Sequence, residues 1–178
     1  MTLRQLRVAD APSLLAHLND ERVWRYISPC PCTRTGFERF IRWTHSTRRT
    51  GKHMCFGMVP EGERGAVGVI QIWPIERDFS TAEWGFALGE AFWGRSLFAA
   101  GAELFIHAVF ADLGVHRLEA RVVDVNDRAI RLFERLGARR DGVLRDGFRD
   151  GTCMRDHVMW SILAPEWHAQ RRRTIASI

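Results

Sequence analysis

The segment from Glu83 to Ala100 constrains this chain most, because it joins a strand, a short turn and an apolar helix. Its pattern predicts a strand over 81–88, a turn at Gly94 and Arg95, and a helix from Ser96 to about Leu113. The first N–H groups of a helix lack intrahelical acceptors, and the helix dipole places positive charge there. Arg95 adds a guanidinium suited to pyrophosphate oxygens, so this turn is a candidate phosphate site.

The length of 178 residues fits one domain, 1–178, which ends in a basic tail over about 165–178. The first residues contain no apolar run, so no secretion signal is expected. The longest apolar stretch, Leu97 to Phe110, is too short and too polar to span a membrane. We therefore expect a cytoplasmic protein with no membrane partner.

The four cysteines do not have the spacing of a disulfide framework, so reduced thiols are expected. A zinc site could use three of them with His45 or His53, but the pairs lack the usual ligand spacing, and no metal is expected. The cysteines are Cys30, Cys32, Cys55 and Cys153.

The chain is basic, with a formal net charge of +5 and a run of arginines over 171–173. Such a run is typical either of a solvated tail or of a contact with an acidic partner such as nucleic acid. We favour the solvated tail, because the sequence contains no evident aromatic-rich basic patch of the nucleic-acid-binding type.

Two helices are expected near the N-terminus, one capped by Asp10 and one that starts at Thr33 or Thr35. Phe37, Phe40, Ile41 and Trp43 should form the buried side of the second. A third helix follows Arg95 and is apolar on nearly every side, so it should be buried. A fourth is capped by Asn126 or Asp127 and ends at Gly137. Strands are predicted over 3–8, 53–59, 66–73, 81–88, 116–123, 143–148 and 154–163. The fold class is therefore α/β (α+β), with a mostly antiparallel mixed sheet of about seven strands and about four helices.

Four segments in this order resemble the GNAT N-acetyltransferases, and most closely the branch that contains ribosomal-protein N-terminal (alanine) acetyltransferases. The resemblance covers nearly the whole chain and implies the GNAT fold and acetyl transfer from acetyl-CoA to a primary amine. The segments are Ala82–Phe86, Trp93–Arg95, His116–Ala120 and Asn126–Ala138.

The resemblance also implies where acetyl-CoA, the expected cosubstrate, would bind. The backbone of a splayed strand would pair with the pantetheine arm, and the following turn would hold the pyrophosphate. Asn126 resembles the asparagine that contacts the cofactor arm, and Phe133 matches an aromatic residue near the sulfur. The strand residues are Phe86, Ala87 and Leu88, and the turn residues are Arg95, Ser96, Leu97, Phe98, Ala99 and Ala100.

Glu83 precedes the expected splay and is the candidate general base, acting directly or through water. An N–H at Phe86 or Ala87 is placed to bind the developing oxyanion, and direct attack in a ternary complex is expected, without an acyl-cysteine. The sequence departs from the family pattern in three places. Phe98 stands where glycine or alanine is usual, Ala129 replaces a serine, and Phe133 replaces a tyrosine that often serves as general acid.

Several alternatives stay open. Glu83 could instead be a solvent-facing strand carboxylate, and Asn126 could serve only as a helix cap. The acceptor could be a peptide or protein N-terminal α-amine, or a small molecule such as a polyamine, an antibiotic or a metabolite. A non-catalytic acyl-CoA sensor and a nucleic-acid-binding protein are further alternatives. The chain could act as a monomer or as a homodimer.

Overall fold

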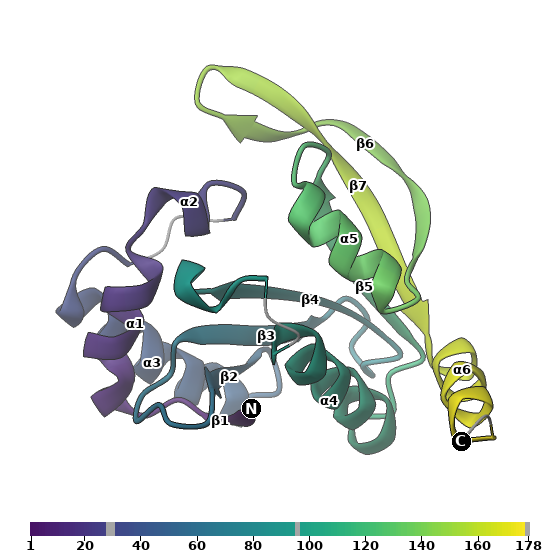
Figure 1. Cartoon of the computed structure of the whole chain (residues 1–178), viewed down its shortest axis with the longest axis horizontal. Coiled ribbons are helices and arrows are strands. Elements are labelled where there is room, and N and C mark those ends of the chain that lie inside the picture. Colours follow the sequence, from purple (N-terminus) through teal and green to yellow (C-terminus); the bar gives the residue numbers. More distant parts are fainter. Residues whose placement is uncertain (28–30, 95–96, 177–178) are drawn as a thin grey trace. The chain divides into compact units, whose positions relative to one another are not determined.

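The computed structural model describes residues 1–27, 31–94 and 97–176, with side chains as far as residue 172. Within these ranges, seven strands form one sheet in the order β1-β2-β3-β4-β5-β7-β6 (Figure 1). Among the described pairings, β4–β5 is parallel, whereas β1–β2, β2–β3, β5–β7 and β6–β7 are antiparallel. This confirms the predicted mixed sheet. The strands are β1 (Thr2–Gln5), β2 (Met54–Val59), β3 (Gly68–Pro74), β4 (Thr81–Leu88), β5 (Arg117–Val123), β6 (Arg139–Asp150) and β7 (Cys153–Leu163).

The described residues form six α-helices where about four were predicted. The additional ones are α2, a single turn capped by Asp20, and α6, which occupies the expected basic tail. Four residues are too few to show a helical period, and Trp167, which anchors α6, is buried by tertiary contacts rather than by a local pattern. The helices are α1 (Ala11–Leu18), α2 (Glu21–Trp24), α3 (Arg34–Arg49), α4 (Leu97–Asp112), α5 (Asp127–Arg135) and α6 (Ala164–Ala176).

The chain forms two compact units, which we describe separately. The first comprises Met1–Trp73 with Trp84–Phe105, and the second comprises Pro74–Glu83 with Ile106–Ile178. In the first unit, α1 and α3 lie beside β1 and β2 (Figure 1) and contribute apolar side chains to a buried core. That core contains Leu6, Leu14, Leu18, Phe37, Ile41, Cys55 and Val69.

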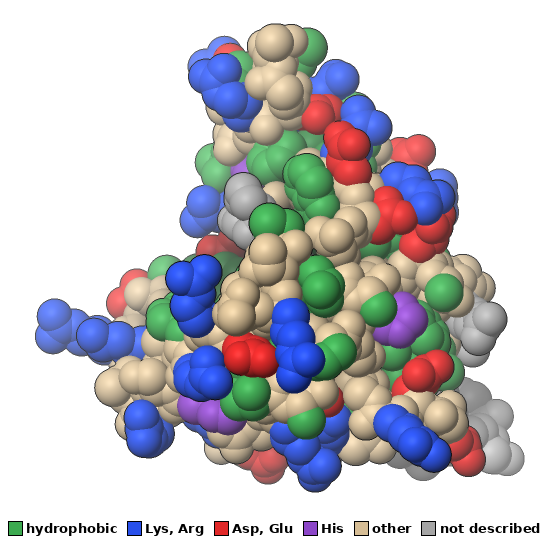
Figure 2. Space-filling model, turned by 90° about the vertical axis from the view of Figure 1, so that its left-hand side faces the viewer, with side chains coloured by type: hydrophobic (Ala, Val, Ile, Leu, Met, Phe, Trp, Pro, Cys, Tyr) green, Lys and Arg blue, Asp and Glu red, His purple; other side chains and the backbone are tan. Residues whose placement is uncertain are grey.

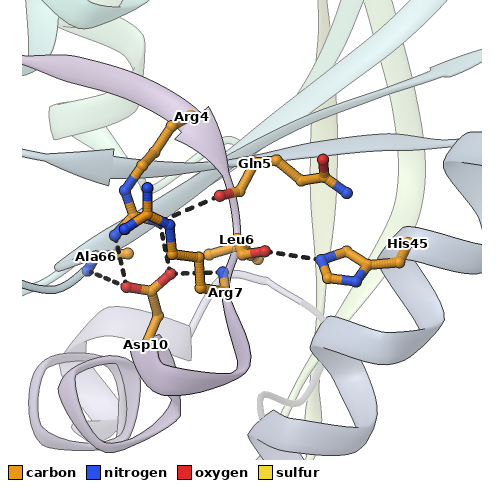
Figure 3. A network of polar contacts seen from close by, with 7 residues as sticks. All are labelled: Arg4, Gln5, Leu6, Arg7, Asp10, His45 and Ala66. Carbon is orange, nitrogen blue, oxygen red and sulfur yellow. Dashed lines mark hydrogen bonds and ion pairs between the residues drawn. The ribbon is translucent and has the colours of Figure 1, made fainter.

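Asp10 does not cap α1 with its side chain, contrary to the prediction. Its carboxylate instead accepts two hydrogen bonds from the Arg4 guanidinium, at 2.8 and 2.7 Å (Figure 3). It also accepts the backbone N–H groups of Arg7, at 2.7 Å, and Ala66, at 3.2 Å. Asp10 therefore ties β1 to the segment before β3, which lies 56 residues further along the chain.

The buried side of α3 differs from the prediction at Trp43, whose side chain is 49% exposed. Phe37, Ile41 and Thr44 form the buried row, at intervals of four and three residues. Thr44 is accommodated there because its hydroxyl donates to the Ile41 carbonyl, at 2.7 Å. Trp43 points elsewhere and packs its ring on His53, with 4.7 Å between centroids.

In the second unit, β5 lies against β7, and the buried faces of the two strands meet in register. Leu118 is opposite Ile162, and Ala120 is opposite Trp160, all of them buried. Beside them, β6 and β7 form a hairpin that is longer than predicted (Figure 1), because β6 already begins at Arg139. Register shifts after Arg140 and after Leu144 interrupt its ladder.

The helix after the turn, α4, is not buried on every side as predicted. Phe98, Ala102, Phe105 and Ile106 are buried, whereas Leu104 is 56% exposed. An apolar sequence on all sides therefore did not correspond to full burial. No helix in the described part of the chain is long and apolar enough to cross a membrane.

Candidate active site

The end of β4 is fixed in the first unit by hydrogen bonds to its last residues. The Trp93 indole N–H donates to the Leu88 carbonyl, at 2.7 Å, and the Gly89 N–H donates to the Val67 carbonyl, at 3.0 Å. Gly94 then turns the chain with φ 70°, a conformation that residues with a side chain rarely adopt. The direction in which the chain leaves β4 is therefore set by Trp93 and Gly94.

The start of α4 carries the predicted phosphate-site residues that can be described. Leu97 is half-buried, Ala99 is buried and Ala100 is exposed. Arg95 and Ser96 lie outside the described residues. The first-turn N–H groups of α4 remain suited to an anion, because a helix provides no acceptors for them.

Phe98 packs inward, against the strand that is expected to hold the pantetheine arm. Its ring centroid lies 4.3 Å from that of Phe86, and its side chain is only 9% exposed. Phe86 also packs against Trp84, with 5.7 Å between centroids. The bulky residue at the usual glycine or alanine position is therefore part of the core, and it does not cover the first turn of α4.

Glu83 lies in the second unit, at the end of the described pairing between β4 and β5. The register joins Thr81, Ala82 and Glu83 to Arg117, Leu118 and Glu119. The Glu83 side chain is 14% exposed, and its carboxylate lies 3.4 Å from the Arg121 guanidinium. The alternative of a freely solvated strand carboxylate is thus not what the structure shows.

A row of charged side chains on β5 surrounds this carboxylate. Arg117 lies 2.5 Å from Glu119 and also contacts Asp141 of β6. Burial opposes ionisation of Asp141, but hydrogen bonds from Arg117 and Ser161 hold the pKa of Asp141 below its ordinary value. Glu83 therefore lies beside Arg121, whereas Glu119 and Asp141 share Arg117.

His157 of β7 belongs to the same surroundings and was not singled out from the sequence. It is paired in register with Val123 at the end of β5. Burial lowers the pKa of His157, and the positive charge of Arg121 lowers it further, although Asp124 opposes this. Its imidazole is therefore neutral at pH 7. The alternation of apolar and polar residues along β7 does not predict this lowered pKa, because the shift depends on burial and on Arg121 of β5.

Asn126 and Phe133 are placed by α5. The Asn126 side-chain oxygen accepts the Ala129 N–H, at 3.3 Å, so Asn126 caps the helix as one alternative proposed. Phe133 is 3% exposed and packs on Trp160, with 6.0 Å between centroids. Phe133 therefore contributes to the core of the second unit.

The thiols differ in their surroundings. Burial raises the pKa of Cys55 to about 12, whereas Cys32 and Cys153 are exposed. Cys30 lies outside the described residues. Within the described ranges, no three or more His, Cys, Asp and Glu side chains gather in a way that could hold a metal ion.

Comparison with known proteins gives one consistent result. Residues 1–139 match the sequence model of the acetyltransferase (GNAT) domain. N-acetyltransferase p20 of Bacillus licheniformis is 26% identical over 168 residues, or 94% of each chain. The [ribosomal protein uS5]-alanine N-acetyltransferase of Escherichia coli is 23% identical over 137 residues, which are 76% of this chain and 71% of that enzyme.

A solved structure shows the same fold. Mycobacterium smegmatis RimJ, in complex with CoA-disulfide, superposes with a TM-score of 0.83 at 22% identity. The superposition covers 92% of this chain and 82% of RimJ.

Proposed function

We propose a specific acceptor on the following premise: this chain belongs to the GNAT family and is an acetyl-CoA-dependent acyltransferase that acetylates an amine. The proposed acceptor is the N-terminal α-amine of a peptide or protein. The observation that carries the proposal is the largely buried Glu83 carboxylate beside Arg121, three residues before Phe86 on the same strand.

In the proposed reaction, the backbone of Phe86, Ala87 and Leu88 holds the arm of acetyl-CoA, and the turn at Arg95–Ala100 holds its pyrophosphate. The amine attacks the thioester carbonyl, whose oxygen accepts a hydrogen bond from the backbone N–H of Phe86 or Ala87. Glu83 accepts the amine proton. The new C–N bond replaces the C–S bond, and the thiolate leaves. Because a thiol has a pKa of about 8.5, this leaving group needs little help from an acid, and Phe133 in place of tyrosine is tolerable.

The basicity of the amine favours an α-amine over a lysine side chain. An α-amine has a pKa of about 8, against about 10.4 for lysine, so far more of it is unprotonated near neutral pH. A site with Glu83 as its base therefore works better on the more acidic amine. The E. coli relative, by its name, acts on an alanine of ribosomal protein uS5, which agrees with this choice.

Two arginines of the β6–β7 hairpin could repel a polycationic acceptor, but they do not support the proposal. Arg145 and Arg149 are each followed by an aspartate, Asp146 and Asp150, which offsets their charge. Selection against polyamines therefore rests on amine basicity. Acetylation of a small-molecule amine is the alternative.

The test compares three acceptors at one pH with saturating acetyl-CoA and detection of the released thiol. The acceptors are a neutral peptide with a free N-terminal alanine, the same peptide with a blocked N-terminus and one lysine, and spermidine. We expect the highest kcat/KM for the free N-terminus. A clear preference for spermidine would contradict the proposed acceptor while leaving the acetyltransferase activity intact.

A further inference from the structure

The outward side of α3 combines arginines with an exposed aromatic ring. Positions 39, 42, 43, 46 and 49 follow one another at helical spacing and are all exposed. We call them the α3 outer face: Arg39, Arg42, Trp43, Ser46 and Arg49. The apolar pattern of the sequence placed Trp43 on the buried side of the helix, so it did not predict this surface. In the structure, the exposed Trp43 ring lies among the arginines of α3.

The charge of this face is strongly one-sided. The sequence of α3 holds five arginines and a single acidic residue, Glu38. Glu38 pairs with Arg34 at 3.2 Å and with Arg42 at 3.7 Å, so it offsets part of the positive charge at the Arg42 end of the face and leaves Arg39 and Arg49. From Arg39 to Arg49 no acidic residue is present. On the whole side of the molecule that Figure 2 draws, Lys and Arg side chains recur among some Asp and Glu side chains, consistent with the net charge of +5.

The exposed ring of Trp43 is held rigidly from below. It packs against His53 with the two rings tilted by 41° and their centroids 4.7 Å apart, and His53 stacks on Trp73 at 6.2 Å. Phe40 stacks on it, with 5.9 Å between centroids. His53 itself is buried and lies 3.1 Å from the Gln71 side-chain oxygen. Trp43 is therefore a fixed aromatic platform, half of which faces solvent.

A basic hollow adjoins this face. Its volume is about 480 Å³, and it is lined by Gln5, His45, Arg48 and Arg49. His45 is fixed by the Leu6 carbonyl, 2.7 Å from its Nε2, as Figure 3 shows. Arg48 lies over the Phe56 ring, 5.0 Å from its centroid. Arg49 belongs both to the hollow and to the α3 outer face, so the two are continuous.

We propose that the α3 outer face and this hollow bind single-stranded nucleic acid. The arginines would contact phosphates, and Trp43 would stack on a base, which is the combination that single-strand binding requires. An anionic membrane suits the face less well, because Trp43 is its one apolar side chain. The acidic side chains of a peptide would pair with the arginines but would not stack on the Trp43 ring. The inference rests on α3 and its neighbours and is independent of the proposed acceptor.

The test measures fluorescence anisotropy of a labelled, mixed-sequence RNA of twelve nucleotides with the full chain, over a salt series. We expect a Kd of the order of 10⁻⁶ to 10⁻⁴ M at physiological salt. Arg49→Gln should weaken binding and make the slope of log K against log salt shallower by about 0.7, the value for one single-strand phosphate contact. Arg64→Gln, in the exposed turn between β2 and β3, removes the same charge away from α3 and should leave binding unchanged.

Trp43→Ala should weaken binding roughly tenfold, within the range for one base–aromatic stack, with little change in the salt slope. Because Arg49→Gln changes only a surface side chain, it decides the question even if Trp43→Ala perturbs folding. Absence of binding at low salt would overturn the proposal, as would equal effects of Arg49→Gln and Arg64→Gln. Displacement of the RNA by acetyl-CoA, or tighter binding of poly-glutamate or of anionic vesicles, would likewise overturn it.

Discussion

Glu83 and Glu119 are register partners on the parallel strands β4 and β5, and each carboxylate has its own arginine. Arg121 lies 3.4 Å from Glu83, and Arg117 lies 2.5 Å from Glu119. Like charges placed side by side on neighbouring strands repel each other, and the two guanidiniums offset that repulsion. The two glutamates can therefore be compared directly. Both are largely buried, both lie on parallel strands, and each has a different arginine beside it, but only Glu83 is proposed to act on the substrate.

Glu83→Gln should leave acetyl-CoA binding intact and lower kcat by roughly a hundredfold, the low end for loss of a general base. Steady-state rates over a pH series, with acetyl-CoA affinity measured by calorimetry, check this.

Glu119→Gln is the matched control and should turn over near the wild-type rate. If both variants lose the same fraction of activity, the charged row has a structural role and Glu83 is not the base.

Asp10→Asn should destabilise the first unit by about 3 kcal/mol, the lower end for breaking a buried ion pair. Burial alone would raise the pKa of Asp10, but hydrogen bonds from Arg4, Arg7 and Ala66 outweigh it and lower that pKa below 3.8. A lowered folded-state pKa stabilises the protein above the unfolded value, and this stabilisation is lost as the pH falls below about 4. Urea denaturation should therefore show a large difference between wild type and Asp10→Asn at pH 7. At pH 3.5 the difference should begin to shrink, because the Asp10 carboxyl of the unfolded chain is already partly protonated there.

Asp20→Asn is the control for that measurement. Asp20 also pairs with an arginine, Arg22, at 2.6 Å, but both side chains are well exposed. Exposed ion pairs contribute little, so Asp20→Asn should barely shift the denaturation midpoint. Equal shifts for the two variants would show that the Asp10 network is not a special feature of this fold.

The positions of the strands along the chain and the turn at Gly94 could be predicted from sequence, because both depend on local patterns. The hydrogen bonds of Asp10 and the exposure of Trp43 could not be predicted in this way. A cap and a long-range anchor use the same residue type, and the Asp10 partner at Ala66 lies 56 residues away. The apolar pattern of α3 placed Trp43 on the buried side, but Thr44 occupies the inner position, where its hydroxyl donates to the Ile41 carbonyl. The Glu83–Arg121 pair likewise depends on the register of two strands, which no local pattern specifies.

Cys55 should resist alkylation in the folded protein, whereas Cys32 and Cys153 should react. Burial raises the pKa of Cys55 from 9.0 to about 12, so no thiolate forms at pH 8. Timed labelling with iodoacetamide and peptide mass spectrometry measures each site. The same raised pKa means that Cys55 stabilises the fold fully below pH 9 and less as the pH rises towards 12. Labelling of Cys55 as fast as that of Cys32 would contradict its burial.

Acetyl-CoA should stabilise the folded chain. Ligand at about a hundred times its Kd adds roughly 2.7 kcal/mol to the free energy of unfolding. Thermal melts with and without millimolar acetyl-CoA measure the shift. Arg95→Ala should reduce it, because the guanidinium is proposed to contact the pyrophosphate, while Arg64→Ala should not. An unchanged melting temperature in the wild type at millimolar acetyl-CoA would refute the binding site.

Phe98→Ala separates the packing role of this residue from any role in cofactor binding. The ring of Phe98 is buried and lies 4.3 Å from Phe86, so its removal should cost about 3 kcal/mol of stability, as for other buried phenylalanines. Because the side chain points into the core, its loss should not strengthen acetyl-CoA binding, even though alanine is usual at this position in the resembling family. Urea denaturation measures the first effect, and calorimetric titration at a temperature where the variant is folded measures the second. A variant that is as stable as wild type and binds acetyl-CoA more tightly would show that Phe98 obstructs the phosphate site instead of supporting β4.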